Sequence, residues 1–455
     1  MRKVLIAFLF LLTTNPCGLL AEKITAELVE AQTLENNPSI KQAKYNLYMA
    51  EQELYSSFSA FLPNVEFFGT LAPGLDKGFY QTYNMFGQEV TDKKLGDQRY
   101  TYGLNGHLSL FSGFADYNNT RSLSAKAKTA KEAYTRSVSD AVLNAQSAYV
   151  NLMYTYESIS LYKQIKKRKK ENVDLIKLRY HSGSADLGSL RRVESDVKSF
   201  EYELEKAQRA IETVSAALLI AIGRNDEMTI LETDEKIGSG IDIDGDGIGD
   251  SFNDEIISRP DFGNLITKTP EFLSAKYNFA AAKALNWAQK GQWLPSLAIE
   301  GNINHQRYDQ AWNPENKSWA VQLNLRYPLF TGGKRWFGTR SALAQEKKAA
   351  ENFRYMQNTL KVKAVQYYTD WVNSYEYIEV IKYILECSKL QLEIAKQKYI
   401  NGLISYEDWY SIDTQYTDAQ RHMLTARQKA LTSRIEWRKF LGKVSMRDKE
   451  DKNEK

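Results

Sequence analysis

The sequence predicts a mainly α-helical protein with a membrane β-barrel part, built from two tandem repeats of long coiled-coil helices with one β-hairpin each. Three observations predict this fold: the chain repeats itself, four segments alternate polar with apolar residues, and two long stretches lack Gly and Pro. The Leu-Pro pairs that end at Pro63 and Pro295 lie 232 residues apart, whereas Gly183 and Gly402 lie 219 residues apart. Two parallel copies of about 200 residues therefore follow one another.

The N-terminal segment, residues 1–21, has the pattern of a cleaved export signal. Two basic residues precede an apolar run, and a small residue, Ala21, ends the segment. Cys17 raises the alternative of a lipoprotein, but the residues before it do not resemble a lipidation signal. The rest of the chain is predicted to divide into a first repeat, an inter-repeat linker, a second repeat and a charged tail, at 22–223, 224–260, 261–443 and 444–455.

Composition argues against a surface for nucleic acids. The formal net charge of +4 falls to +2 when Arg2 and Lys3 leave with the export signal, which is too little charge for such a surface. Beyond residues 1–21, no apolar run approaches the roughly 18–20 residues of a membrane helix. Only Cys387 then remains, so the sequence predicts no disulfide within the chain.

Four segments alternate polar and apolar residues with the period of a β-strand, and each repeat contains two of them. In the last segment, apolar side chains from Trp319 to Leu329 alternate with polar side chains such as Gln322. About ten residues with this alternation are typical of a tilted strand that crosses a bilayer with its apolar face toward lipid. A soluble sandwich of half-buried strands is the alternative. The strands are predicted at about 64–72, 100–111, 296–305 and 318–330.

Four strands cannot close a membrane barrel, because an open sheet edge in lipid would leave backbone groups without partners. Several chains are therefore expected to share one barrel, and three chains would supply twelve strands. The connections at 72–99 and 306–317 are polar and are expected to be irregular loops. His107 and His305 are expected to face the barrel lumen. The four histidines lack the spacing of metal ligands and no phosphate-binding loop follows a strand, so the sequence predicts no enzyme.

Long helices are predicted at about 114–182, 184–222, 334–401 and 403–441. An unbroken helix between Gly113 and Gly183 would reach about 100 Å. Apolar residues from Val138 to Ile159 recur at alternating steps of four and three, the spacing of a coiled coil. Gly183 and Gly402 are expected in the tight turns that join the helix pairs. The basic run from Lys163 to Lys170 is interpreted as a solvated helix face, with contact to an adaptor or to lipid headgroups as the alternative.

The linker contains a pattern of oxygen-bearing residues that is typical of a calcium loop. Side chains at alternate positions converge on one side of a curled loop, and Gly247 stands where the tight turn is needed. The usual final Glu is replaced by Asn253, so the pattern is closer to a thrombospondin type 3 loop than to an EF-hand. A bound Ca²⁺ would brace the linker, and a flexible acidic linker is the alternative. The predicted ligands are Asp242, Asp244, Asp246, the carbonyl of Ile248, Asp250 and Asn253.

Four motifs make residues 24–443 resemble the outer-membrane efflux protein family, the TolC-like outer-membrane factors. The motifs are Glu35-Asn36-Asn37-Pro38, the Leu-Pro before each first strand, Leu-Phe-Ser-Gly or Leu-Phe-Thr-Gly-Gly after each second strand, and the Tyr-x-x-Gly turns. The resemblance implies a homotrimer in the outer membrane of a Gram-negative-type bacterium, with a twelve-stranded barrel and an α-helical tunnel through the periplasm. It also implies a passive exit duct without a cofactor, coupled to a periplasmic adaptor and an inner-membrane pump or secretion ATPase.

The resemblance further implies acidic residues that narrow the periplasmic entrance, six and nine positions past the second turn glycine. The sixth position is Asp408, whereas the ninth is Ser411, with Asp413 close by. Three copies of Asp408 around an axis would attract cations, and a solvated carboxylate at a helix start is the alternative. A periplasmic coiled-coil scaffold or adaptor without a pore is the alternative function. The cargo, drugs or metals or proteins, is not decided by this sequence because the pump selects it.

Overall fold

The computed structural model describes residues 22–72, 79–83, 89–94, 99–224, 229–233, 235, 237, 260–307 and 316–442. The predicted export signal with Cys17, the predicted calcium loop at 242–253 and the charged tail lie outside these ranges. The chain forms two compact units. The sheet unit consists of Gln42–Arg136 and Ile266–Lys361, and the helical unit consists of Met1–Lys41, Ser137–Leu265 and Val362–Lys455. None of the helices in the described ranges combines the length and the apolar composition needed to cross a bilayer.

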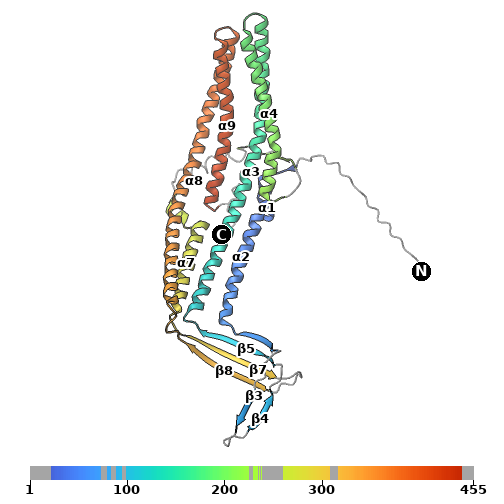
Figure 1. Ribbon diagram of the computed structural model, residues 1–455. Coiled ribbons are helices and arrows are strands. Elements are labelled where there is room, and N and C mark those ends of the chain that lie inside the picture. Colours follow the sequence, from blue (N-terminus) through green and yellow to red (C-terminus); the bar gives the residue numbers. More distant parts are fainter. Residues whose placement is uncertain are drawn as a thin grey trace, which may run out of the picture. The chain divides into compact units, whose positions relative to one another are not determined.

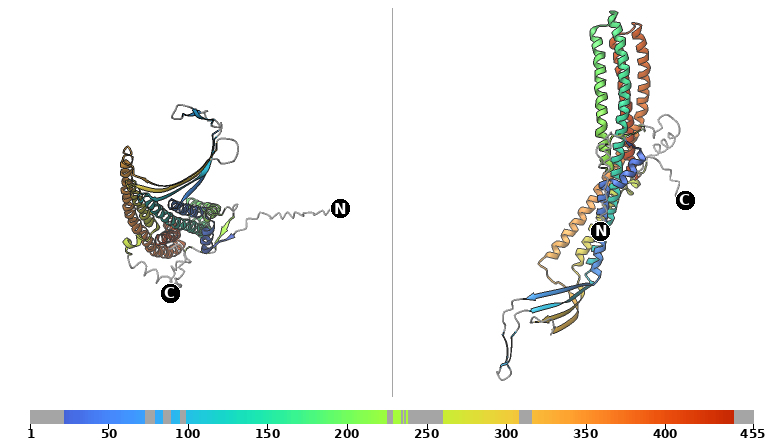
Figure 2. Two further views of the ribbon diagram at one scale, coloured as in Figure 1. Left: turned by 90° about the horizontal axis from the view of Figure 1, so that it is seen from below. Right: turned by 90° about the vertical axis from the view of Figure 1, so that its right-hand side faces the viewer.

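The sheet unit contains a curved, four-stranded antiparallel sheet in the order β2–β5–β7–β8 (Figures 1 and 2). Each repeat supplies one hairpin, and the two hairpins join where β5 pairs with β7. The predicted last strand extended to residue 330, but β8 ends at Arg326 because Pro328 has no backbone N–H to donate. The strands are β2 (Asn64–Ala72), β5 (Arg99–Phe111), β7 (Ser296–Arg307) and β8 (Asn316–Arg326).

The connection between β2 and β5 is more regular than expected. It contains a second antiparallel hairpin, β3 (Phe79–Tyr83) with β4 (Glu89–Lys94), where the sequence predicted an irregular loop. Aromatic and β-branched residues in these two short segments favour strands, although the surrounding residues are polar. This hairpin lies in the segment where the first repeat is longer than the second.

Cross-strand pairing gives the sheet one apolar face and one polar face. Directly opposed residues of antiparallel strands lie on the same face, so each row of pairs can be followed across the sheet. One row is apolar on all four strands, and on β8 the exposed fraction of Trp319 is 78%. That row consists of Phe67, Leu104, Ile303 and Trp319, and the neighbouring row on the opposite face consists of Glu66, Asn105, Asn302 and Ala320.

The two histidines of the sheet lie on opposite faces, so the prediction that both share the polar, lumen-facing side is wrong for His305. His107 pairs with Glu300 on the polar face, and its Nδ1 lies 3.7 Å from a carboxylate oxygen of Glu300. His305 pairs with Tyr102, and their rings stack with centroids 5.1 Å apart. The reason is the strict period of two, since His305 lies two residues beyond Ile303 and therefore on the same face.

Helices precede and follow the strands of the sheet in the sequence. Gly113 and Gly291 allow two of these segments to approach each other closely. A Cβ atom at Gly113, which has a φ of +65°, would collide with the carbonyl oxygen of Gly291. The end of α7 therefore packs directly against the turn between β5 and α3. The helices are α2 (Pro38–Ser57), the 3₁₀ helix η1 (Phe58–Phe61), α3 (Ala115–His181), α7 (Pro270–Gly291) and α8 (Lys334–Ile400). Of these, α3 and α8 contain 67 residues each and contribute to both units.

The helical unit is a bundle of antiparallel helix pairs, α3 with α4 and α8 with α9 (Figure 1). Its core includes Val142, Ala145, Tyr149 and Leu152, which are all buried, so the predicted coiled-coil spacing is confirmed. Residues near the N-terminus close the core, because a two-residue parallel bridge joins β1 to β6. The remaining elements are β1 (Glu22–Lys23), α1 (Ala26–Asn36), α4 (Leu187–Ile222), β6 (Leu231–Glu232), α6 (Phe262–Ile266) and α9 (Tyr406–Phe440).

Candidate functional site

The two helical hairpins end in turns centred on Gly183 and Gly402 (Figure 1). Both glycines have positive φ, +75° and +73°, and open space surrounds the position of a Cβ atom on each. The N–H of Gly183 donates to the carbonyl of Tyr180 at 3.0 Å, and the N–H of Ser184 donates to the carbonyl of Arg179 at 2.8 Å. This pair of bonds is a Schellman motif, and α8 ends in the same motif.

The helix that leaves each turn begins with the same cap, but the two side chains are exchanged between the repeats. At the start of α4, Asp186 accepts from the N–H of Ser189 at 2.9 Å and from its hydroxyl at 2.6 Å. At the start of α9, Ser405 accepts from the N–H of Asp408 at 3.1 Å and donates its hydroxyl to Asp408 at 2.6 Å. Asp408 is therefore one half of a capping box, a role that the sequence-based interpretation did not foresee.

The three residues predicted at the entrance constriction do not share one surface. Asp408 and Ser411 are exposed and lie three positions apart on α9, so they belong to the same helix face. Asp418 is also exposed further along that face. Asp413 instead lies in the interior of the helical unit, with an exposed fraction of 1%.

A buried ion cluster surrounds Asp413 and joins the two helical hairpins. The ammonium Nζ of Lys169 on α3 lies 2.6 Å from Oδ2 of Asp413 on α9 and 2.9 Å from Oδ2 of Asp196 on α4. The hydroxyl of Tyr410 on α9 donates to Asp196 at 3.1 Å. One ammonium group therefore links α3, α4 and α9, at about 20 Å along the helices from the turns.

Arg168 extends this ion cluster on the α9 side. Its guanidinium donates to Gln420 at 2.9 Å and to Thr417 at 2.7 Å, and it stacks over the ring of Tyr416 at 4.7 Å. Its Nε lies 3.3 Å from Oδ1 of Asp413, which is within ion-pair distance although the two atoms are not aligned for a hydrogen bond. The planar fork of the guanidinium thus holds two successive turns of α9.

The buried ion cluster raises the pKa of Lys169, whereas the exposed helix cap lowers the pKa of Asp186. Burial alone would lower the pKa of Lys169, but Asp413 and Asp196 outweigh it, so the pKa is raised above its ordinary value. At the exposed cap, the hydrogen bonds from the hydroxyl and the N–H of Ser189 lower the pKa of Asp186. Lys169 is therefore a permanently charged group in the protein interior at neutral pH.

The interpretation of Lys163 to Lys170 as a solvated helix face is wrong for Lys169, whose exposed fraction is 2%. Ile165, Asn172 and Ile176 are buried on the same helix, and with Lys169 they follow steps of four, three and four. Lys169 thus occupies a coiled-coil core position, which is the sequence signal that could have identified it. The neighbouring Lys170 remains exposed on the helix surface.

No group of three or more His, Cys, Asp or Glu residues within the described ranges is arranged to hold a metal ion. The site as a whole consists of two capped helical turns, an exposed polar helix face and a buried ion cluster.

A protein family described as outer membrane efflux protein matches residues 30–224 and 263–443. The chain belongs to this family. It is 21% identical to the outer membrane protein TolC of Vibrio cholerae over 447 residues, which cover 96% of this chain and 95% of the relative. It is 19% identical over 295 residues to SilC of Salmonella typhimurium, a probable outer membrane lipoprotein, covering 64% of this chain and 59% of the relative. The fold is also similar to the crystal structure of VceC, an outer membrane protein from Vibrio cholerae, with a TM-score of 0.73 and 17% sequence identity. The matched region covers 92% of this chain and 96% of VceC.

Family membership decides between the two predicted functions. The efflux protein is an outer-membrane exit duct of a tripartite efflux pump, and the alternative of a periplasmic scaffold without a pore is set aside. The prediction of two tandem repeats with long helices and β-hairpins is confirmed by the fold and by the family match, which also has two parts. The family is one of transport channels, and the outer-membrane location of this chain follows from its relatives.

Proposed function

We propose that the efflux protein works as a homotrimer in which three four-stranded sheets join edge to edge into one twelve-stranded barrel. The proposal rests on the two outer strands of the sheet, β2 and β8, each of which has one edge without a partner strand in the described residues. Within the described residues, β2 pairs only with β5 and β8 pairs only with β7. In a membrane, these outer edges would expose unpaired N–H and C=O groups to lipid, so a neighbouring chain must cover them.

The faces of the sheet support the same assembly. On β8, the alternate residues Trp319, Val321 and Leu325 are 78%, 70% and 71% exposed, although large apolar side chains normally avoid water. Contact with lipid would cover these side chains, and the polar row with Glu66 and Asn105 would then line the barrel interior.

The helices provide the periplasmic part of the proposed duct. We infer that the exposed polar face of α9 lines the tunnel near its entrance, with Asp408 and Ser411 closest to the turn. Three symmetry-related Asp408 carboxylates would attract cations at the narrowest point. Asp413 does not belong to this ring, because Lys169 and Arg168 hold its carboxylate inside the helical unit.

The ends of the helical hairpins are the proposed contact for the periplasmic adaptor, and through it for the inner-membrane pump or ATPase. The turn glycines Gly183 and Gly402 have open space around them, so a partner can approach the backbone closely. Transport through such a duct needs no cofactor of its own. The calcium loop in the linker is proposed only as a structural brace.

Two measurements on the purified protein test the assembly. Mass determination in detergent should give three chains per particle, and planar bilayers containing the protein should carry a steady single-channel current. A monomer that stays soluble without detergent and carries no current would overturn the proposal.

The entrance residue requires a substitution that keeps the helix cap. Asp408→Ala would remove the capping box together with the charge, so Asp408→Asn is the sharper variant, because an amide oxygen can still accept from Ser405. Asp408→Asn should lower the preference of the channel for cations over anions. Ser405→Ala is the matched control, since it breaks the same cap without changing any charge. Equal cation preference in wild type and Asp408→Asn would exclude Asp408 from the constriction.

A further inference from the structure

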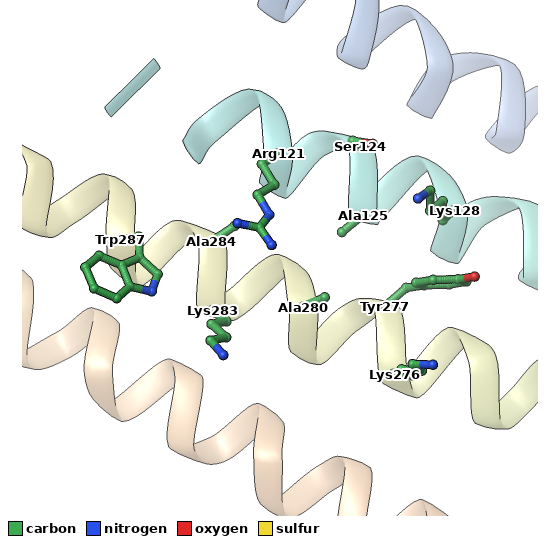
Figure 3. A pocket seen from close by; sticks show the side chains of 10 residues that line it. All are labelled: Arg121, Ser124, Ala125, Lys128, Lys276, Tyr277, Ala280, Lys283, Ala284 and Trp287. Carbon is green, nitrogen blue, oxygen red and sulfur yellow. The ribbon is translucent and has the colours of Figure 1, made fainter. Parts of the chain in front are cut away.

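A basic groove lies between α3 and α7 in the sheet unit (Figure 3). It has a volume of about 300 Å³ and is lined by four cationic side chains and two aromatic rings. Arg121 and Lys128 come from α3, and Arg121 reaches from that helix toward α7 (Figure 3). The remaining cationic and aromatic residues that line the groove are on α7, namely Lys276, Tyr277, Lys283 and Trp287.

Small residues and a hydrogen bond between the two helices shape the groove. Ala125 and Ala284 are buried at its floor and leave the space that larger side chains would fill. The hydroxyl of Ser122 donates to the carbonyl of Ala281 at 3.0 Å, which holds α3 against α7. The groove is therefore a consequence of how the two helices pack and does not depend on the position of a loop.

The charge of the groove is uncompensated within the described part of the chain. Arg121, Lys128, Lys276 and Lys283 make no ion pair with a carboxylate there. The sequence explains this, because the facing segments 118–131 and 272–291 contain four and three basic residues and no acidic one. Like charges gathered around one cavity repel each other, so an anion in the groove would be attracted by all four.

The groove lies close to the sheet. Arg121 lies six residues after the start of α3, which begins four residues after β5 ends. Trp287 lies four residues before the end of α7, which leads into β7. This end of the groove is thus within about 10 Å of the helix ends that connect to the strands. Trp287 is 52% exposed, and Lys290 lies over its ring at 4.6 Å. Exposed Trp and Tyr beside cations are typical of the level where lipid headgroups meet a membrane protein.

We propose that this groove binds a phosphate-bearing group. A phosphate group carries the negative charge and the acceptor oxygens with which Arg and Lys form charge-assisted hydrogen bonds. Two sources share this chemistry, the headgroup of an anionic phospholipid and a soluble phosphate ester. In the proposed trimer, neighbouring chains pair with β2 and β8, whereas α3 and α7 connect to the central strands β5 and β7, so the strand pairing itself does not cover the groove.

Phosphatidylglycerol and glycerol 3-phosphate are suitable probes, because the first presents a phosphodiester on a lipid and the second presents a phosphate monoester on a soluble molecule. Lipid binding to the detergent-purified trimer is measured by native mass spectrometry, with phosphatidylcholine as the zwitterionic reference, and glycerol 3-phosphate is titrated by calorimetry. The variant Arg121→Gln/Lys283→Gln should lose binding of the effective probe by at least about tenfold, since two charge-assisted contacts disappear. Arg121→Lys/Lys283→Arg keeps both charges and should retain binding.

The matched control is Lys126→Gln/Lys347→Gln, which removes the same charge from exposed positions that do not line the groove. Selective, groove-dependent retention of phosphatidylglycerol identifies a lipid site, and groove-dependent binding of glycerol 3-phosphate identifies a soluble ligand. The proposal is overturned if neither probe binds, or if the groove variant and the control bind equally. Trimer mass and conductance, measured on the same samples, report separately on the proposed duct.

Discussion

Lys169 and Asp413 form an ion pair of 2.6 Å in the interior of the helical unit, and their side chains are only 3% and 2% exposed. The pair joins a helix of the first repeat to a helix of the second. Asp196 is the second carboxylate at the Lys169 ammonium, so the cluster carries two negative charges against Lys169 and the nearby Arg168. The contacts between opposite charges offset the cost of burying Lys169 and Asp413 in a helix bundle.

Removing the buried ammonium should destabilise the protein far more than removing an exposed one. Lys169→Met removes the ammonium group that Asp413 and Asp196 share and is expected to lower the free energy of unfolding by about 3–5 kcal/mol. Lys170→Met is the control, because Lys170 is 57% exposed and its pair with Glu201 spans 3.7 Å. Such a surface pair contributes about 1 kcal/mol at most. Guanidinium denaturation followed by circular dichroism measures both, and equal losses would show that the buried cluster does not stabilise the fold.

The same cluster predicts how stability depends on alkaline pH. Because the folded pKa of Lys169 is raised above the value of 10.5 for the free side chain, its contribution is fully present below pH 10.5. It is lost as the pH rises above that value, since the unfolded chain releases its proton first. The stability difference between wild type and Lys169→Met should therefore stay constant below pH 10.5 and shrink as the pH rises above that value. A difference that also stays constant above pH 10.5 would contradict the assignment.

The turn glycines should resist substitution because of their backbone conformation. Gly402 has a φ of +73°, and a side chain there is expected to cost about 1–2 kcal/mol even though the space around it is open. Gly338 is the control, because it lies inside α8 and a Cβ atom on it would meet only Gln289 at an ordinary 3.7 Å. Gly338→Ala should be neutral or stabilising by up to about 1 kcal/mol. Equal effects of Gly402→Ala and Gly338→Ala on the denaturation midpoint would disprove this account of the turn.

Calcium binding is a prediction from the sequence of the linker alone. Isothermal titration of the calcium-free protein should show one Ca²⁺ per chain, with a dissociation constant of about 10⁻⁴–10⁻³ M if the site resembles other extracellular modules. Asp244→Ala should abolish this binding, because it removes one of the predicted ligands. Asp418→Ala, an acidic substitution on the exposed face of α9, should leave it unchanged. A chelator would then lower the melting temperature of wild type but not of Asp244→Ala.

The elements of this fold could be predicted because their patterns are local. Alternation with period two marks the strands around Trp319, and steps of four and three mark the buried helix face around Tyr149. The turn at Gly402 is equally local, because a helix that ends in a Schellman motif needs a residue with positive φ. The β3–β4 hairpin was missed because its strands are short and lie in a polar segment.

The candidate site was predicted less completely, because its contacts join residues far apart in the sequence. The distance of Asp413 from Gly402 along the chain suggested a place near the entrance, but only the packed bundle shows that its carboxylate points at Lys169. Likewise, the sequence places Lys169 and Lys170 in one basic run, but only Lys169 is buried against α4 and α9, and Lys170 is exposed.

The sequence by itself determined the repeats, the types of element and the family, because backbone periodicity and turn chemistry act over a few residues. The tertiary structure decided which charges are buried, that Asp408 belongs to a helix cap, and that the cations of α3 and α7 surround one groove. Those outcomes depend on which helix faces meet. Helix contacts are long-range, and their energies depend on burial, which no local pattern of residues specifies.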